Sequence, residues 1–586
     1  MPQKNKKVSQ LSPAKPLRLW PAAVAALLLL MAKFVIPAIL PDALPFVMFG
    51  SLFMALAIMV WWLFFSRARV IDRLGIIVLM AVSLIAVRPL LHESIDKAGM
   101  GILFLILAIP TLSFALAISA LVSGRLSAAR RRIVMIAAIL CAAGGWALVR
   151  TGGLNNSGNS DFSWRWSPSP EEQLLAEVEH EQTVTPLVAP ADFAAEPEWS
   201  GFRGQNRDGI IHNVRIETDW LVYPPEELWR QPVGPGWSSF AVQGELFYTQ
   251  EQRGEEEVVS CYRLKTGETV WIHSDKTRFW ESNGGAGPRG TPTLNRGRVY
   301  SLGGTGILNV LNAHDGSVIW SRNVGTDTNT KTPMWGFSGS PLVMDDMVFV
   351  SASGSLIAYD VNTGESRWSK TVQDDCYSSP HFFTKDSVQQ ILLQNRSGVI
   401  SVSPIDGAVL WEHAWSGQPI VQPTLVPGGD VLISIDDRSG MRRLAVKQGT
   451  DGWTAEERWT SDRLKPYFND SVIHEDHVYG FDGPRLACMD LKDGARKWKG
   501  GRYGRGQCIL LADQDVLLVL SEKGDLALVQ AAPDAFIEIA RIPAIKGKTW
   551  NHPVLVENIL LVRNAEEMAA FRLTLKEQFD VTLTKN

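Results

Sequence analysis

Cysteine is scarce in this 586-residue chain, and the spacing of its five cysteines fits no metal-binding signature. Cys141 stands in an apolar run, and Cys261, Cys376, Cys488 and Cys508 stand in the more polar part that follows. An oxidising compartment would permit disulfides among those four, whereas buried free thiols are the simpler alternative. The sequence therefore predicts no metal centre.

Motifs for several kinds of chemistry are also missing. The chain has no phosphate-cradling glycine loop, no Gly-x-Ser-x-Gly elbow and no His-Glu-x-x-His pair. Residues 1–150 carry an excess of about 12 positive charges, which leaves about −16 for the remainder of a chain whose total is −4. Because the later part is acidic, nucleic acid is not an expected partner.

Long apolar runs are confined to the first 150 residues, where five of them occur at 19–40, 44–65, 73–90, 100–122 and 132–149. Each is near the length that a helix needs to cross the hydrocarbon of a bilayer. We therefore expect a five-helix transmembrane domain over residues 19–150.

Basic residues give this domain an orientation. They gather in the tail 1–18 and in the second and fourth loops, at Lys4, Lys6, Lys7, Lys15, Arg18, Arg67, Arg69, Arg73, Arg125, Arg130, Arg131 and Arg132. The positive-inside bias makes these segments cytoplasmic. With five spans, everything after Arg150 then lies outside the cytoplasm. Lys33, inside the first run, either snorkels outward or marks a pocket with Asp42, Glu93 and Asp96.

Residues 151–197 change character and read as a periplasmic tether. They combine small polar residues, an acidic stretch with a helical turn, and scattered prolines.

A repeated turn dominates the rest of the chain: Asp-Gly or Thr-Gly, followed by a strand-like run into tryptophan. The tryptophans recur at intervals of 42, 49, 48, 43, 48 and 39, at Trp229, Trp271, Trp320, Trp368, Trp411, Trp459 and Trp498. A period in the forties with short alternating strands is typical of β-propeller blades. One tryptophan per blade would fill the contact with its neighbour, so these side chains are expected to be structural.

Strand openers fix the expected number of blades at eight. They begin at residues 237, 289, 338, 377, 420, 468, 505 and 550. The last unit lacks a tryptophan strand of its own, while Trp229 precedes the first opener. We therefore predict an all-β propeller over 198–575 with eight four-stranded blades, in which the strand around Trp229 completes the last blade and closes the ring. Residues 576–586 form a C-terminal tail.

The repeated Tyr/Leu-Asp-x-x-Thr-Gly-x-x-x-Trp unit, fullest at Tyr359 to Trp368, resembles the tryptophan-docking repeats of the quinoprotein (pyrroloquinoline quinone, PQQ) propeller superfamily. The stretches FRGQNRDG and WGFSGSPLV are similar to those of PQQ-like repeat proteins. That superfamily includes PQQ-dependent dehydrogenases and the non-enzymatic outer-membrane assembly lipoprotein BamB. Five spans before a propeller also resemble membrane-bound quinoprotein glucose dehydrogenase. The chain departs from the enzymes in having no adjacent cysteine pair and no recognisable calcium or catalytic set.

The openers predict a ring of side chains at one mouth of the channel, because the innermost strand of each blade lines it. Position one offers Trp237, Arg289, Ser338, Tyr377, Ile420, Phe468, Arg505 and Trp550, with Lys331, Trp335 and Arg502 beside them. Two residues further on is a polar second tier of Ser239, Thr291, Ser340, Ser379, Gln422, Asp470, Gln507 and His552. The predicted binding residues are Trp237, Arg289, Trp335, Tyr377, Phe468, Arg505, Trp550 and His552.

Aromatic rings and guanidinium groups converging on a funnel suit a small planar anion, and PQQ is one. A water-filled polar mouth that binds a peptide, or nothing, is the alternative. We expect an integral membrane protein whose periplasmic propeller binds a ligand or a protein partner as an assembly module. The other candidate function is a PQQ-dependent dehydrogenase of alcohols or sugars that passes electrons to ubiquinone.

Overall fold

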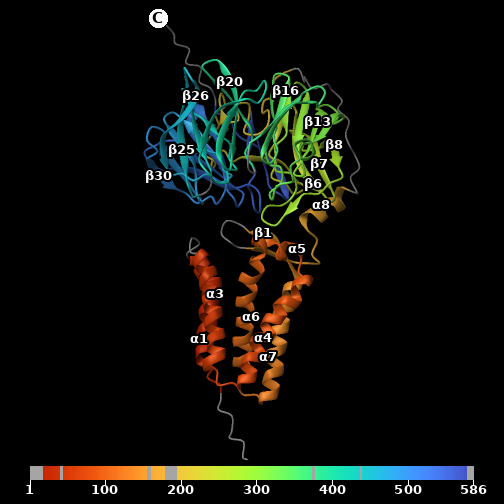
Figure 1. Ribbon diagram of the computed structural model, residues 1–586, viewed down its shortest axis with the longest axis vertical. Coiled ribbons are helices and arrows are strands. Elements are labelled where there is room, and N and C mark those ends of the chain that lie inside the picture. Colours follow the sequence, from red (N-terminus) through yellow and green to blue (C-terminus); the bar gives the residue numbers. More distant parts are fainter. Residues whose placement is uncertain are drawn as a thin grey trace, which may run out of the picture. The chain divides into compact units, whose positions relative to one another are not determined.

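The computed structural model describes residues 17–39, 44–154, 160–178, 195–372, 376–435 and 438–576. Most of the basic tail, Asp42, much of the tether and nearly all of the C-terminal tail lie outside these ranges. The chain divides into two compact units, Met1–Ser167 and Pro168–Asn586, which Figure 1 shows as helices and as a ring of strands. Each unit is described by itself below.

The first unit is helical. Its helices are α1 (Trp20–Leu30) with η1 (Met31–Val35) and α2 (Ile36–Ile39), α3 (Leu44–Val60) with η3 (Trp61–Phe65), α4 (Val70–Val87) with η4 (Arg88–Leu90), α5 (Glu93–Asp96), η5 (Ala98–Gly101), α6 (Leu103–Val122), and α7 (Ala128–Gly144) with η6 (Gly145–Leu148). Within the described residues, three segments are long and apolar enough to span a membrane, 70–90, 103–122 and 128–148, and 20–35 and 49–65 are shorter apolar helices. These five segments agree with the five predicted runs.

Helix α6 supplies much of the core of this unit. Ala108, Leu112, Leu116, Ala117 and Ala120 on it are fully buried. Small residues at this spacing let neighbouring helices approach closely. A hairpin of β1 (Val149–Leu154) and β2 (Ser160–Trp164) follows the last helix.

The second unit is a ring of eight antiparallel sheets, as predicted. From the channel outward, blades 1 to 4 are β5 (Ala241–Gln243), β6 (Leu246–Arg253), β7 (Glu256–Arg263) and β8 (Thr269–Asp275); β11 (Thr293–Asn295), β12 (Arg298–Leu302), β13 (Ile307–Asn312) and β14 (Val318–Asn323); β15 (Leu342–Met344), β16 (Met347–Ser351), β17 (Ser355–Asp360) and β18 (Ser366–Thr371); and β19 (His381–Lys385), β20 (Val388–Asn395), β21 (Gly398–Val402) and β22 (Val409–Ala414).

Blades 5 to 8 follow the same plan. They are β23 (Thr424–Leu425), β24 (Asp430–Ser434), β25 (Met441–Gly449) and β26 (Gly452–Ser461); β27 (Val472–His474), β28 (His477–Asp482), β29 (Arg485–Asp490) and β30 (Arg496–Gly500); β31 (Gln507–Leu511), β32 (Val516–Leu520), β33 (Asp525–Gln530) and β34 (Glu538–Pro543); and β35 (Val554–Val556), β36 (Ile559–Arg563), β37 (Glu567–Arg572) and β4 (Glu226–Pro232). Smaller elements are β3 (Ile210–Ile211), β9 (Trp280–Glu281), β10 (Gly285–Ala286), α8 (Pro170–Val178), α9 (Val324–Thr328) and η7 (Ala512–Gln514).

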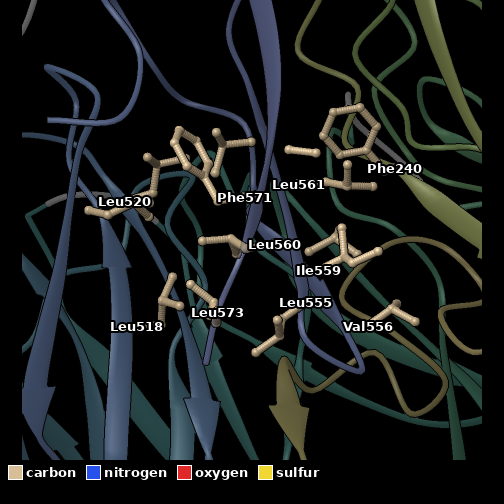
Figure 2. Close-up of a cluster of buried hydrophobic side chains, with 14 of the residues drawn as sticks. Phe240, Leu518, Leu520, Leu555, Val556, Ile559, Leu560, Leu561, Phe571 and Leu573 are labelled. Carbon is tan, nitrogen blue, oxygen red and sulfur yellow. The ribbon is translucent and has the colours of Figure 1, made fainter. Parts of the chain in front are cut away.

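The early strand β4 closes the ring, which confirms the predicted topology. It pairs with β37, and Trp229 stands opposite Ala570. A core of buried aliphatic and aromatic side chains seals this point, with contributions from blades 7, 8 and 1 (Figure 2). Because β4 covers what would otherwise be an exposed edge, the last blade cannot pair with another chain there.

The repeated tryptophans dock between blades. The indole Nε1 of Trp229, Trp271, Trp320, Trp368, Trp459 and Trp498 donates to a carbonyl in the next blade, at 2.7 to 3.0 Å. For Trp320 the acceptor is Val361, and the ring lies over Gly364 of the same turn. Gly364 has φ +67°, and a Cβ there would lie 2.6 Å from Trp320 Cδ2. The turn therefore requires glycine both for its backbone and for the ring that covers it.

Trp411 is an exception with a local cause. The outer hairpin of blade 5, β25 and β26, is long and turns at Gly449 and Gly452. The indole of Trp411 instead donates to Gln390 of its own blade, at 2.8 Å.

The cysteines of the propeller are all buried: Cys261, Cys376, Cys488 and Cys508. Burial raises the pKa of Cys508 to about 12, so its thiol stays protonated. The structure therefore agrees with buried thiols, the simpler of the two alternatives for these cysteines.

Candidate functional site

The propeller channel is occupied by the chain's own residues 199–211, which we call the channel plug. The plug contacts every blade. Trp199 pairs with Val242 in blade 1 and Ser200 O accepts from Leu294 N in blade 2, while β3 runs parallel to β31 in blade 7. Phe202 meets the ring of His552 in blade 8 at 5.2 Å between centroids.

Two arginines of the plug reach the remaining blades. Arg207 donates to Pro380 O at 2.6 Å and to Ser340 O at 3.2 Å, and its own carbonyl accepts from Gln422. Arg203 donates to Ser471 O at 2.7 Å. Four blades, numbers 3 to 6, are therefore tied to one segment through two guanidinium groups and one carbonyl.

The two plug arginines have an unfavourable backbone conformation, and burial of Arg207 disfavours its charge. Arg203 has φ 59° and Arg207 has φ 56°, a region that costs about 1–3 kcal/mol for a residue with a side chain. Burial lowers the pKa of Arg207 to about 9, which still leaves it charged at neutral pH. Burial, and then the charge of Arg207, lower the pKa of the adjacent His381 to about 3, so His381 is neutral.

The polar second tier is a hydrogen-bonded ring between blades. Ser239 N donates to Thr291 Oγ1 at 3.0 Å, Thr291 N to Ser340 Oγ at 2.9 Å, and Ser340 N to Ser379 Oγ at 2.9 Å. On the other side, Gln422 N donates to Asp470 Oδ1 at 3.2 Å. These contacts join the blades, although Gln422 Oε1, Gln507 Oε1 and His552 Nε2 of the same tier are buried without a hydrogen-bond partner among the described residues.

His552 belongs to this interior and not to the mouth. Its Nε2 lies 3.8 Å from Asp470 Oδ2, and the other oxygen of that carboxylate, Oδ1, lies 3.6 Å from Arg203 Nη1. Burial and Arg203 lower the pKa of His552 to about 3. Of the predicted binding residues, His552 therefore lies beside the plug as a neutral ring.

Five predicted residues do come together at one end of the channel, which we call the mouth. Trp237 and Trp550 have ring centroids 4.7 Å apart, and Phe468 and Trp550 are 4.9 Å apart. Arg505 lies over Phe468 at 5.8 Å. Arg289 joins them through the β9–β10 ribbon, because it bonds Glu281 and Gly285 O there while Trp237 Nε1 donates to Gly284 O.

Trp335 and Tyr377 form a separate pair, with ring centroids 4.8 Å apart. Tyr377 is buried, and Trp335 is partly exposed. Lys331 and Arg502 are exposed. The predicted ring is thus split into two groups. One is the cluster from blades 6, 7, 8, 1 and 2, and the other is the Trp335–Tyr377 pair from blades 3 and 4.

Lys548 is the main member of the mouth that the sequence analysis missed. Its Nζ lies 4.4 Å from the centre of the Trp550 ring and 5.2 Å from that of Trp237, and it donates to Asn283 O at 3.2 Å. Glu522, which accepts from Trp550 Nε1 at 3.0 Å, was missed as well. Lys548 stands two residues before an opener, so extending each opener backward would have found it. Glu522 lies between β32 and β33, where the repeat gives no signal.

The mouth does not fit PQQ in this arrangement. A planar ring system between two aromatic faces needs them about 7 Å apart, twice the carbon–carbon contact distance. The Trp237 and Trp550 rings touch one another at 35° and those of Phe468 and Trp550 at 51°. The carboxylates of Glu281 and Glu522 also oppose a tricarboxylate. Within the described residues, no group of three His, Cys, Asp or Glu side chains could hold a metal ion.

A rigid apolar turn precedes β4. Leu221 is 98% exposed, Val222 62% and Tyr223 44%. Trp220 is buried and anchors the turn, and Asp219 accepts hydrogen bonds from Leu221 N, at 3.1 Å, and from Tyr223 N, at 2.8 Å. Three consecutive exposed apolar side chains on a fixed turn are typical of a surface that another molecule covers.

Helix α8 is fixed to the mouth side of blade 1. Glu171 forms an ion pair with Arg278 at 2.7 Å and accepts from Gly254 N at 2.9 Å, while Leu174 is buried. Arg278 stands three residues before Glu281 of the mouth. The same connection between blades 1 and 2 therefore holds both α8 and Arg289.

Comparison with known proteins agrees with the propeller. A family model described as outer membrane protein assembly factor BamB matches residues 254–500. The BamB of Shewanella oneidensis is 24% identical over 51% of this chain and 75% of the relative. The BamB of Yersinia pestis is 27% identical over 25% of this chain, and the match spans about a third of that relative, 36%.

Solved structures with similar folds include BamB from Moraxella catarrhalis, with 16% identity and a TM-score of 0.44 over 59% of this chain and 97% of that one. Quinohemoprotein alcohol dehydrogenase from Comamonas testosteroni has 13% identity and a TM-score of 0.47 over 70% and 85%. The family model and the curated relatives bear out the resemblance to BamB-like repeat proteins.

Proposed function

We propose that this protein is anchored in the bacterial inner membrane and presents its propeller in the periplasm as a module that binds another polypeptide during envelope assembly. The observation that carries the proposal is the exposed turn Leu221–Val222–Tyr223, which is both apolar and rigid. The curated relatives are named as outer-membrane assembly factors, which agrees with a protein partner.

The filled channel supports the same proposal. Both plug arginines and several second-tier side chains hydrogen-bond within the protein, and the mouth aromatics contact one another. A cofactor in the channel would have to displace these contacts. A surface turn needs no such rearrangement.

A photo-crosslinking amino acid at Val222 tests the proposal in intact cells. We expect a discrete adduct that disappears when Leu221 and Tyr223 are both changed to Asp. The same crosslinker at Asp493, an exposed position in another turn, is the control. An adduct pattern identical at 222 and 493 would contradict the proposed surface.

The proposed topology has its own test. Alkaline phosphatase fused after residue 576 should be active, because that enzyme matures only outside the cytoplasm, and a fusion in the loop after Arg125 should be inactive. The reverse result would overturn the periplasmic placement.

The dehydrogenase alternative is favoured by one observation, the aromatic rings and cationic side chains that share the mouth. Membranes supplied with PQQ, calcium, alcohols or sugars and an artificial electron acceptor should reduce no dye if the module is a binder. Dye reduction that depends on PQQ would favour the enzyme.

A further inference from the structure

Lys548 occupies an environment unlike that of the other lysines with described contacts. Its ammonium group lies against two indole faces, and within the described residues its one hydrogen-bond acceptor is the carbonyl of Asn283. Lys265 and Lys447, for comparison, are mostly exposed and paired with carboxylates at 3.1 and 2.8 Å. Lys548 has therefore lost most of its water without gaining a contact ion pair.

The four charged groups that face Lys548 come from three connections around the mouth. They are Arg289 and Glu281 from the segment between blades 1 and 2, Glu522 between β32 and β33, and Glu566 between β36 and β37. Arg289 is itself held by Glu281 at 3.1 Å. Burial and the positive charge of Arg289 outweigh the three carboxylates and lower the pKa of Lys548 to about 8. A desolvated amine beside a second cation is the arrangement that makes lysine nucleophilic.

Access is not blocked, since Lys548, Trp237 and Trp550 all remain partly exposed. Arg505 lies over Tyr467 at 4.2 Å and over Phe468 at 5.8 Å on the neighbouring side of the same cluster. Arg289, Arg505 and Lys548 equal Glu281, Glu522 and Glu566 in number, so a ligand with a single negative charge meets no net repulsion at the mouth. Aromatic walls and guanidinium groups would hold a carboxylate there.

We propose that Lys548 is a nucleophilic amine that forms a reversible imine with a small carbonyl compound bearing one carboxylate, an aldehyde or keto acid, bound at the mouth. Nζ attacks the carbonyl carbon, so that an N–C bond forms as the C=O π bond breaks. Loss of the former carbonyl oxygen as water, with protons from the amine and from solvent, gives the imine. The step needs no oxidant or reductant, and it is independent of the partner-binding function.

Reductive trapping on the purified full-length protein tests this site. Glyoxylate is the probe, and sodium cyanoborohydride reduces any imine to a carboxymethyl-lysine that peptide mass spectrometry locates. At pH 7.5 we expect Lys548 to be labelled at least about tenfold faster than Lys265 and Lys447, because far more of its amine is unprotonated. Acetaldehyde, which lacks the carboxylate, should label Lys548 with less preference.

Two variants separate a reactive amine from a merely accessible one. Arg289→Gln removes the neighbouring positive charge, so the pH at which labelling is half-maximal should rise from about 8 toward that of the exposed lysines. Arg458→Gln removes a half-exposed cation of blade 5 and should leave the profile unchanged. Circular dichroism confirms that each variant is folded.

Labelling of Lys548 at the rate of Lys265, or a profile unmoved by Arg289→Gln, would overturn the proposal. Crosslinking at Val222 would be unaffected by either outcome, so the two proposals fail separately.

Discussion

Between neighbouring blades the same contact is made repeatedly, whereas at the mouth each blade contributes a different side chain. Six indoles donate to a carbonyl of the next blade at nearly one distance, 2.7 to 3.0 Å. Trp237, Arg289, Phe468 and Lys548 meet at the mouth through ring–ring, guanidinium–carboxylate and cation–π contacts. The repeated tryptophans fill the same contact between neighbouring blades. The mouth residues differ from blade to blade and are not needed for that contact, so they are available for a function.

The channel plug is a third kind of region, since it occurs once and contacts every blade. Removing one of its arginines should have the largest effect on the stability of the propeller. Arg207→Ala leaves several buried carbonyls without a donor and is expected to destabilise the propeller by about 4 kcal/mol. Chemical denaturation followed by β-sheet circular dichroism measures it. Arg458→Ala is the control, because Arg458 is 50% exposed in its ion pair with Asp430 and should cost about 1 kcal/mol or less. Equal losses would show that the plug does not brace the blades.

A buried carboxylate at the closure of the ring makes the stability of the propeller depend on pH. Glu251 in blade 1 accepts from Tyr262 OH at 2.9 Å and from Gly234 N at 2.5 Å, and it pairs with Arg253 at 2.8 Å. Burial raises its pKa, but Arg253 and Arg563, the latter from blade 8, reverse this and lower it to about 2.

Because the folded pKa is depressed, Glu251 stabilises the fold above pH 4.5 and loses that contribution as the pH falls toward 2. Glu251→Gln should therefore cost about 3 kcal/mol at pH 7 and progressively less below pH 4.5. Denaturation midpoints of both proteins from pH 7 to pH 3 measure the difference. A gap that stays constant across this range would contradict the assignment.

Two glycines separate backbone strain from tryptophan docking. Gly364 and Gly483 have similar backbones, with φ +67° and φ +63°, but an added Cβ would strike Trp320 at 2.6 Å in the first and nothing within 4 Å in the second. Gly483→Ala should cost about 1 kcal/mol, and Gly364→Ala about 1–2 kcal/mol more. Thermal unfolding of both variants gives the comparison. Equal costs would mean that the ring over Gly364 is not tightly packed.

The smallest effect should distinguish the exceptional tryptophan. Trp320→Phe removes a hydrogen bond between blades, and Trp411→Phe removes one within blade 4. Each should cost about 1–2 kcal/mol. Hydrogen exchange at the blade 2–3 boundary should increase for the first variant, while the blade 4–5 boundary should remain protected in the second.

The fold could be predicted because its determinants are local and repeated. Eight openers, and the missing tryptophan strand after Trp550, were enough to predict both the number of blades and the closure by the strand around Trp229. The plug could not be predicted in this way. FRGQNRDG occurs once, so no period reveals it, and its arginines act through backbone carbonyls that any sequence would supply.

The site was predicted in part. Trp237, Arg289, Phe468, Arg505 and Trp550 follow from their places in the openers, while Lys548 and Glu522 reach the mouth from positions that no repeat marks. His552 stands two residues after Trp550 and so belongs to the second tier. Because that tier lies deeper in the channel than the first, its ring meets Phe202 of the plug.

By itself, the sequence determined a membrane-type helical segment, eight blades and the strand that closes them, since apolar length and periodic turn chemistry are properties of neighbouring residues. Only the tertiary structure decided that the channel is plugged, that the mouth aromatics stack on one another, and that Lys548 lies between two indoles beside Arg289. Those arrangements depend on residues hundreds of positions apart meeting at one axis, where burial and neighbouring charge, not residue type, set their chemistry.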